Sequence, residues 1–532
     1  MSVKPIKDIK LNVRPVTVAL HHDYVFEGPC RFGEGVQLTA DYDQTVNGMI
    51  SKGFQANLEK EFDLDKINFL PHVFIDRNEE FLITDEDMAK VAEDIDKVDA
   101  FFVCQAIRTY DFVIEMAERF NKPVIISPTF AVDVIATAAI AATGRKIYPV
   151  RTLDDVRRHF NVLRVKKMLN HMTVLASARL NSNRSMPSAP DGFLSTEDVT
   201  KRMGIRFRYA DPHEIIDSTH PISKQEMYDE NSTNPTTPGR IGLNPDDKDM
   251  EIIGKITDDF IAGAAECDME RTEIFNSVKA WYVVNKFMDH LDCNAFTIPC
   301  PDICATRRLN KERITFCLTH SLNQEFGIPS ACEYDLPALV TQAILMGLSG
   351  KAPYMGNCEN GNLPDSDLDS NGFWGVGGMF KHEASRNEDL PFVQKQQKEK
   401  GGSYVLVTHA VPNRKFKGFD TENAPYAIRS FARSGFGATI RYDFKQDAGQ
   451  VVTLMRIDPL CKKFFIAKGE VVGGIGYKDT NCSEGVFVKI KDHEDFFEKQ
   501  SYFGNHVPLV YGDYIKELKG LAKEFDMEVV EA

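Results

Sequence analysis

Two short, almost continuously apolar segments flank a helical pattern, and they constrain the fold of this chain more than any other feature. The apolar segments span Val98–Ile107 and Lys122–Phe130, and the helical pattern lies near Tyr110–Phe120. Strands that are buried on both faces have unbroken apolar sequences, and two parallel strands need a crossover helix between them. This part of the chain therefore predicts a βαβ unit and a parallel sheet.

The same alternation resumes after a connecting helix that is expected over Arg151–Leu169. Strands and helices that alternate in this way are typical of a second doubly wound α/β domain. The expected strands span Met172–Ser177, Met203–Asp211 and Asn294–Cys300, and the expected helices lie near residues 246–266 and 270–291 and over Leu336–Leu348.

The last third of the chain has a different pattern. Glycine and proline are frequent over residues 350–402, and a last helix is expected from Asp513, as its N-cap, to Phe525. Between these segments, short strands separated by turn residues predict an antiparallel sheet or a small barrel. The expected strands span Tyr404–Ala410, Gly437–Phe444, Val451–Asp458, Phe464–Val472 and Val486–Ile490.

The net charge and the hydropathy of the chain restrict the kinds of partner that it can bind. The formal net charge of -15 argues against nucleic acid, because phosphate binding favours a basic surface. No apolar run reaches the roughly 18 residues that a membrane-spanning helix needs. The N-terminal residues also lack the apolar core of a secretory signal. We therefore expect a cytoplasmic protein with neither a nucleic-acid nor a membrane partner.

The cysteines predict no metal cluster. The chain has 11 of them, scattered along its length, so an odd count leaves at least one thiol without a disulfide partner. Cys293, Cys300 and Cys304 have the spacing C-x6-C-x3-C, which is not a standard zinc or iron–sulfur pattern. We expect these side chains to be reduced thiols that pack in the core.

Three short segments, far apart in the chain, each carry an oxygen or imidazole ligand for a metal ion. A hard divalent cation favours such oxygen-rich, mixed oxygen and nitrogen ligation. A cation held there would bind two adjacent oxygens of a sugar, so the segments predict a metal-dependent sugar site. They are Ala331–Val340 with Glu333, Ser349–Glu359 with Asn357 and Glu359, and Gly504–Tyr514 with His506.

Each of these ligands has a plainer alternative. Asp335, and less so Glu333, would suit the N-terminus of the helix that follows, where a carboxylate caps backbone N–H groups. Asn357 and Glu359 would share one face of an extended strand, but their segment also suits a polar turn. A lone histidine such as His506 is more often a structural or surface residue than a ligand.

Four further residues are candidate substrate contacts. His409 ends a predicted buried strand, and a structural role is the alternative for it. Asn505 directly precedes the imidazole ligand. Trp374 lies in a glycine-rich segment that predicts a loop with an indole ring stacked on a sugar face. Arg14 would bind an anionic group of the substrate.

These motifs resemble the L-fucose isomerase and L-arabinose isomerase group, and the L-fucose isomerase family more closely. The metal-binding Glu of the family's E-x-D motif corresponds to Glu333, and the metal-binding His of its (A/G)-N-H motif corresponds to His506. An Asp that follows a T/S-G-x-A stretch corresponds in position to Asn357. Segments near Arg14 and over Met203–Ile215 are also similar, so the likeness spans almost the whole chain.

The resemblance implies an intramolecular oxidoreductase of carbohydrate metabolism, an aldose–ketose isomerase that uses Mn2+ or another divalent cation and forms an ene-diol. It implies an α/β fold with two Rossmann-like doubly wound domains, over residues 1–165 and 166–350, and a C-terminal β-barrel-like domain over residues 351–532. It also implies a homo-oligomer, a trimer or hexamer, in which a neighbour's first domain completes each monosaccharide site.

Asn357 departs from the family pattern. Ene-diol chemistry needs a base near the carbon-bound proton, and an amide cannot supply one. Either Glu359 replaces the Asp as ligand and base, or Glu333 is the sole base, or the chemistry has changed. A changed activity would be sugar or sugar-acid binding, epimerisation or dehydration. A non-catalytic oligomeric scaffold is the plainest alternative.

Overall fold

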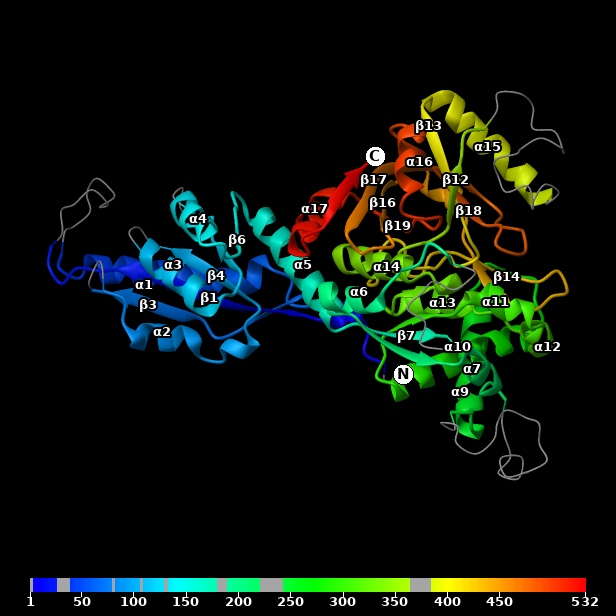
Figure 1. Cartoon of the computed structure of the whole chain (residues 1–532), viewed down its shortest axis with the longest axis horizontal. Coiled ribbons are helices and arrows are strands. Elements are labelled where there is room, and N and C mark those ends of the chain that lie inside the picture. Colours follow the sequence, from blue (N-terminus) through cyan, green and yellow to red (C-terminus); the bar gives the residue numbers. More distant parts are fainter. Residues whose placement is uncertain are drawn as a thin grey trace. The chain divides into compact units, whose positions relative to one another are not determined.

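The chain folds into two compact units of mixed α/β structure. One unit comprises residues 8–167, and the other comprises residues 1–7 together with 168–532. Parallel sheets flanked by helices and a separate antiparallel sheet confirm the mixed α/β class that the sequence predicts (Figure 1). No described helix is both long and apolar enough to cross a membrane. The computed structural model describes residues 3–25, 39–78, 82–105, 109–128, 133–178, 189–220, 243–363 and 384–532.

A parallel sheet with helices on both faces forms the unit of residues 8–167. Its order is β2-β1-β4-β5-β6, and β3 also pairs with β1. The predicted βαβ unit is confirmed, because α3 connects β4 to the parallel strand β5. Phe101 and Phe102, which are adjacent in β4, pack in different core clusters on the two faces of the sheet. Helices α2, α3 and α4 cover the face of Phe101, and helices α1 and α5 cover the face of Phe102. The strands are β1 Leu11–Leu20, β2 Ile67–Phe69, β3 Val73–Arg77, β4 Ala100–Gln105, β5 Val124–Ile126 and β6 Ile147–Tyr148, and the helices are α1 Tyr42–Glu61, α2 Asp85–Ala92, α3 Tyr110–Phe120, α4 Asp133–Ala142 and α5 Leu153–Asn170.

A second parallel sheet, in order β11-β10-β7-β8, begins the larger unit. Its first strand along the chain, β7, is internal, so the chain continues to β8 on one side of β7 and then to β10 on the other. Helix α14 starts a few residues after β11 ends. The strands are β7 Thr173–Ser177, β8 Arg206–Ala210, β10 Ala295–Thr297 and β11 Ser330–Ala331, and the helices are α6 Thr196–Met203, α7 Pro212–Asp217, α9 Asp247–Ala262, α10 Arg271–His290, α11 Cys300–Ala305, α12 Arg308–Glu312, α13 Cys317–Glu325 and α14 Leu336–Ser349.

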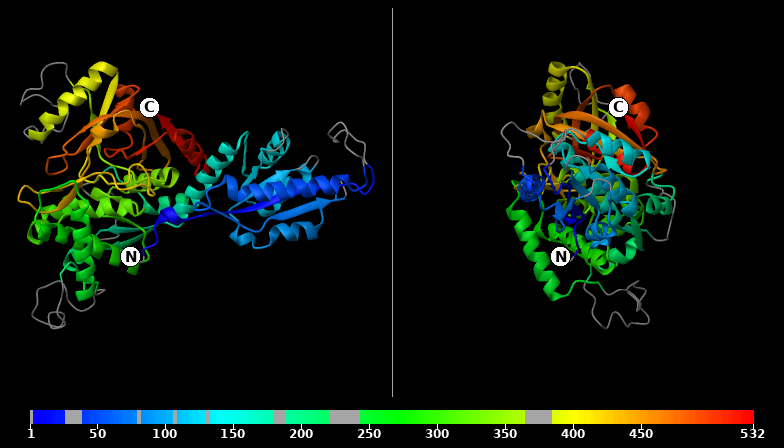
Figure 2. Two further views of the ribbon diagram at one scale, coloured as in Figure 1. Left: turned by 180° about the vertical axis from the view of Figure 1, so that it is seen from behind. Right: turned by 90° about the vertical axis from the view of Figure 1, so that its left-hand side faces the viewer.

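An antiparallel sheet, in order β12-β13-β18-β17-β16-β19, follows in the same unit. Helix α14 contacts both this sheet, at β16 and β19, and the parallel sheet, at β10 and β11. Seen from behind, the red helix α17 lies against the orange strands of this sheet (Figure 2). The strands are β12 Asn357–Asn360, β13 Ser403–Thr408, β16 Val451–Ile457, β17 Lys463–Ile475, β18 Gly485–Ile490 and β19 Leu509–Tyr511, and the helices are α15 Ala384–Lys400, α16 His493–Gln500 and α17 Ile515–Glu524.

The described strands of this sheet do not close into a barrel, because the ladder is open between β12 and β19. Two isolated antiparallel bridges, Tyr354 with Leu509 and Asn357 with His506, nevertheless join the segments at its two ends. The second bridge brings two of the predicted metal ligands side by side, although they lie far apart in the sequence.

Three details differ from the sequence prediction. The strand expected over Gly437–Phe444 lies in a separate small sheet, as β15 Ala438–Arg441 beside β14 Ala427–Ser430 and β9 Glu266–Cys267. The last helix does not end the chain, because β20 Glu528–Glu531 follows it and pairs with β17. Tyr514, not Asp513, is the N-cap of that helix, and the Asp513 carboxylate pairs with Lys468.

Gly356 sets how closely β12 approaches β13 beside the Asn357 bridge. A Cβ atom at Gly356 would lie 2.7 Å from the backbone oxygen of Thr408, so one strand would have to shift. Overpacking of this kind costs about 1–3 kcal/mol. We therefore expect Gly356→Ala to lower the free energy of unfolding by about that amount in chemical denaturation.

The matched control for this substitution is Gly254→Ala. Gly254 lies inside α9 of the same unit, where the nearest heavy atom to an added Cβ is Arg271 Nη2 at 3.8 Å. Alanine is the better helix former by about 0.5–1 kcal/mol, so this variant gains stability. Equal effects of the two substitutions would contradict the close approach of the strands.

Candidate functional site

A strained turn presents Glu333 at the carboxyl end of strand β11. Glu333 and the next residue, Tyr334, both have φ of 61°, a left-handed backbone that costs non-glycine residues about 1–3 kcal/mol each. The turn is held from β10: Thr297 Oγ1 donates to the carbonyl of Ala331 at 2.8 Å, and Tyr334 N donates to Ile298 O at 3.1 Å. Such strain occurs where a side chain is held for function.

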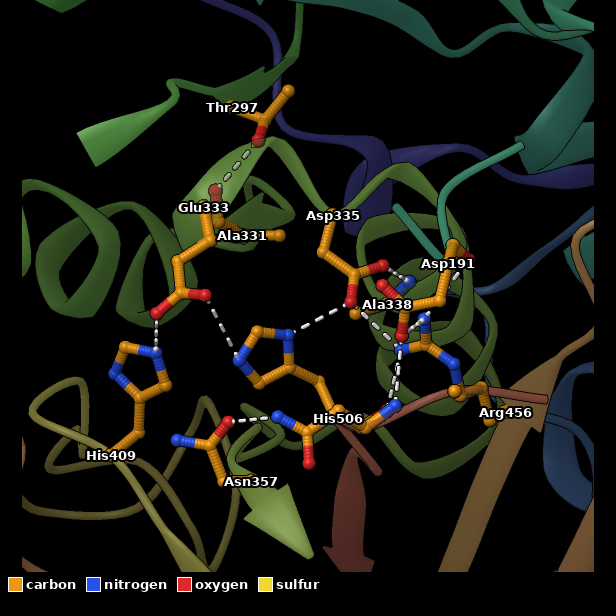
Figure 3. Close-up of polar contacts among 12 residues, drawn as sticks. Asp191, Thr297, Ala331, Glu333, Asp335, Ala338, Asn357, His409, Arg456 and His506 are labelled. Carbon is orange, nitrogen blue, oxygen red and sulfur yellow. Dashed lines mark hydrogen bonds and ion pairs between the residues drawn. The ribbon is translucent and has the colours of Figure 1, made fainter. Parts of the chain in front are cut away.

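Two imidazole rings flank the Glu333 carboxylate, as Figure 3 shows. One oxygen lies 3.6 Å from His409 Nε2, and the other lies 3.7 Å from His506 Nε2. Both rings are buried, and neither Nε2 atom has a hydrogen-bond partner among the described residues. Two buried ring nitrogens without partners therefore point at one carboxylate, and such atoms in a folded protein suit a ligand.

Asp335 fixes the tautomer of His506. Its Oδ2 atom lies 2.8 Å from His506 Nδ1, and a carboxylate only accepts, so Nδ1 carries the proton. The Nε2 atom of His506 then presents a lone pair toward Glu333. A histidine that donates its second nitrogen to a carboxylate is the usual arrangement of a metal ligand.

His409 has the opposite tautomer. Its Nδ1 atom accepts a hydrogen bond from the backbone N–H of Ala410 at 2.9 Å, so the neutral ring carries its proton on Nε2. This Nε2–H points toward the Glu333 carboxylate. His409 is therefore placed as a hydrogen-bond donor to a substrate oxygen, whereas His506 is placed as a ligand.

A buried ion pair supports this arrangement. Asp335 Oδ2 also accepts from Arg456 Nη1 at 2.8 Å, and both side chains are fully buried. Arg456 reaches the carbonyl of His506 at 2.6 Å and the carboxylate of Asp191 at 2.9 Å. Asp335 Oδ1 accepts from Ala338 N, so the helix-cap alternative for Asp335 is confirmed together with its contact to the imidazole.

Both carboxylates of the turn are ionised at neutral pH. Burial raises the pKa of Asp335, but the charge of Arg456 and the hydrogen bond from His506 outweigh it and hold the pKa well below its usual range. Burial likewise raises the pKa of Glu333, but the neighbouring imidazoles of His409 and His506 lower it below its ordinary value. Glu333 is therefore available as an anionic ligand or base.

Asn357 lies beside these groups, at the bridge with His506. Its Oδ1 atom accepts a hydrogen bond from Asn505 Nδ2, and Asn505 N donates to Asp191. Asn505 therefore orients Asn357. Glu359 is two residues further along β12 and pairs with Leu406 of β13. It therefore lies further than Asn357 from the end of β13 that leads to His409.

Two other residues, Arg14 and Trp374, were predicted as substrate contacts. Arg14 belongs to the other unit, where its buried guanidinium donates to the carbonyls of Pro71 and Glu93. Trp374 and its glycine-rich segment lie outside the described residues. The sequence analysis did not find Arg456 or Asp191. An arginine inside the apolar strand β16 was the signal for the first, because a buried charge needs a partner.

The donor set fits a divalent cation. Glu333 supplies a carboxylate, His506 a ring lone pair, and Asn357 an amide oxygen with a second lone pair to offer, all suited to a hard ion such as Mn2+. A different set of described residues, Cys332, Glu333 and His409, has ligand atoms within 4.8 Å of one another. In that set, His409 Nε2 carries a proton, so it is the poorer set for a hard ion.

Comparison of the sequence with protein-family models and with curated proteins finds no match to either. The function of the chain is therefore inferred from its site.

Asp335→Asn should weaken both the fold and the metal site. The amide removes the buried one of the two carboxylates that pair with Arg456, and breaking a buried pair costs about 3–5 kcal/mol of unfolding free energy. It also removes the carboxylate that fixes the tautomer of His506. The loss of a carboxylate that orients a ligand histidine weakens metal affinity about 10–100-fold. Titration of Mn2+ followed by electron paramagnetic resonance measures the affinity.

Glu325→Gln is the matched control for Asp335→Asn. It breaks another buried pair, in which Arg414 donates to Glu325 at 2.6 and 2.8 Å. This variant also loses stability but keeps the Mn2+ affinity of the wild type. A similar loss of affinity in both variants would show that Asp335 acts only through stability.

The lowered pKa of Asp335 predicts how stability depends on pH. A carboxyl group whose pKa is lower in the folded than in the unfolded protein stabilises the fold. This contribution is complete above the unfolded pKa, about 3.9, and is lost as the pH falls toward the folded pKa. In metal-free protein, the stability difference between wild type and Asp335→Asn should shrink by about 1.4 kcal/mol per pH unit below about pH 4. Urea midpoints from neutral to acid pH measure it, and a constant difference would contradict the ion pair.

Proposed function

We propose that this chain is an aldose–ketose isomerase of the L-fucose isomerase type, which uses Mn2+ or a similar divalent cation. The observation that carries the proposal is the Glu333 carboxylate, held between the lone pair of His506 Nε2 and the proton of His409 Nε2. An anionic ligand, a neutral nitrogen ligand and a proton donor from three segments of the chain thus meet in a buried setting.

Glu333, His506 and Asn357 would hold the cation, and the cation would polarise the sugar carbonyl as a Lewis acid. The carboxylate of Glu333 is ionised because its neighbours lower its pKa, so it is available to take the carbon-bound proton of an aldose. His409 Nε2–H would donate to the oxygen on which negative charge develops. Burial of both imidazoles limits the water that competes for these contacts.

Because residue 357 is an asparagine, few residues of the cluster can transfer the carbon-bound proton. Its amide is too weakly basic to take a proton from carbon, and its oxygen already accepts from Asn505. Glu333 is then the base in the described cluster, with His409 as the donor. Glu359 lies two residues further along β12, on the same face as Asn357. Its role as a second catalytic carboxylate stays a prediction.

The finer architecture is part of the same proposal. We propose that the two parallel sheets belong to Rossmann-like doubly wound domains, over residues 1–165 and 166–350, and that residues 351–532 form a barrel-like domain. The internal position of β7 supports a doubly wound order, and the Tyr354 and Asn357 bridges support a barrel-like curvature. A cytoplasmic trimer or hexamer, with a monosaccharide as substrate, completes the proposal.

Isomerase activity can be tested directly. Mn2+-loaded full-length protein, incubated with a panel of aldoses in deuterated water, should yield a ketose with deuterium at the carbon next to the carbonyl, as detected by NMR. Glu333→Gln should lower turnover by about 100-fold or more, because general-base catalysis contributes about 10²–10⁴. Glu325→Gln, which alters a buried carboxylate away from the site, should keep it. The absence of both ketose and deuterium with every sugar would refute the proposal.

A second candidate function follows from the amide pair of Asn357 and Asn505. If that pair was selected for a changed reaction, such as epimerisation or dehydration, or for binding a sugar acid, an added carboxylate would harm it. Asn357→Asp should raise isomerase turnover in an isomerase that lacks its second base. A variant that gains no isomerase activity and loses the binding of sugars favours the changed function.

A further inference from the structure

A cavity of about 630 Å3 lies between helices α9, α10 and α13 of the larger unit. Helix α10 packs against both of the other helices (Figure 1). None of the described residues that line this cavity belongs to the Glu333 cluster. Cavities of about 300–1,000 Å3 hold small organic ligands, so this one has the size of a second binding site.

Aromatic side chains form much of the cavity wall. Trp281 and Phe326 stack on one another, with ring centroids 5.7 Å apart, and Phe260 and Tyr282 also line the cavity. Phe326 is 43% exposed, so one of these rings is open to solvent. Aromatic faces bind apolar groups and also attract cations. The wall therefore suits an apolar ligand that carries positive charge.

The lining has an excess of negative charge. Its two cationic side chains, Lys286 and Arg414, are already paired with carboxylates outside the lining, at 2.7 and 2.6 Å. Its two carboxylates, Asp259 and Asp289, are exposed and have no ion pair among the described residues. The charge that the cavity leaves uncompensated is therefore negative, and it favours a cation.

One polar atom of the wall lacks a hydrogen-bond partner. Asn285 is only 4% exposed, and its Oδ1 atom has no partner among the described residues. The amide is held in this orientation. Trp281 Nε1, which only donates, bonds Asn323 Oδ1 at 2.9 Å, and Asn285 Nδ2 donates to the same oxygen at 3.2 Å. Because buried acceptors normally have a donor, an N–H group of a ligand would complete Asn285.

We propose that this cavity binds an organic cation with an apolar body and an N–H-bearing head, such as an aryl-alkyl ammonium. The head donates to Asn285 Oδ1. Asp289, one helical turn away on α10, and Asp259 on α9 attract its charge. The body lies against the rings of Trp281 and Phe326. Binding is non-covalent and requires neither a metal nor a sugar, so it is independent of the proposed isomerase activity.

Three probes with one phenyl body separate the contributions of charge and hydrogen bonding. They are 2-phenylethylamine, the neutral 2-phenylethanol, and (2-phenylethyl)trimethylammonium, which has the charge but no N–H. Ligand-observed NMR titration of the full-length chain measures their affinities. The amine should bind about tenfold more tightly than either of the others, because only the amine makes a charge-assisted hydrogen bond to the buried acceptor.

Two variants locate the binding. Asn285→Leu should weaken the amine about tenfold and leave the trimethylammonium probe unchanged, because only the amine uses the acceptor. Asp259→Asn combined with Asp289→Asn should weaken both cations about fivefold or more and leave the alcohol unchanged. Glu251→Gln is the matched control and should keep every affinity, since Glu251 is an exposed carboxylate of α9 that does not line the cavity.

Three results would overturn this site. One is equal affinity for the amine and the alcohol. Another is an amine affinity that neither variant changes. The third is the absence of amine binding together with an oligomer that Phe326→Glu dissociates in analytical ultracentrifugation, which would assign the cavity to a second copy of the chain. If Asn285→Leu does not fold, the amine and trimethylammonium probes test the same contact in the wild type.

Discussion

The buried carboxylate of Asp335 is the interaction on which the rest of the site depends. It caps helix α14 at Ala338 N, pairs with Arg456 and orients His506, three tasks in three different segments of the chain. A charge removed from water in this way is tolerated only when all its partners are present. The same contacts that hold the larger unit together therefore set the tautomer of His506.

Backbone geometry brings Glu333 to this point. The turn after β11 holds Glu333 in a left-handed conformation, and the bridge between Asn357 and His506 joins the two ends of the antiparallel sheet beside it. Helix α14 contacts both sheets, so the parallel and antiparallel layers meet at the site. Ligands at the carboxyl edge of a parallel sheet are common in α/β proteins.

Much of this could be predicted from the sequence. Apolar runs and helical periods identified the sheets and most helices, because burial imposes those patterns, and short motifs identified Glu333, Asn357, His409 and His506. The pairing of Asp335 with Arg456 and the tautomers of the two histidines could not be predicted. Each depends on contacts between distant segments, and local pattern carries no information about them.

The central claim is that Glu333 and His506 bind one divalent cation, and anomalous diffraction from crystals soaked in Mn2+ tests it most directly. The account predicts an anomalous peak at the manganese edge within bonding distance of a Glu333 oxygen and His506 Nε2, and its loss in Glu333→Gln. A peak bound by other residues, or no peak at this carboxylate under saturating Mn2+, would contradict it.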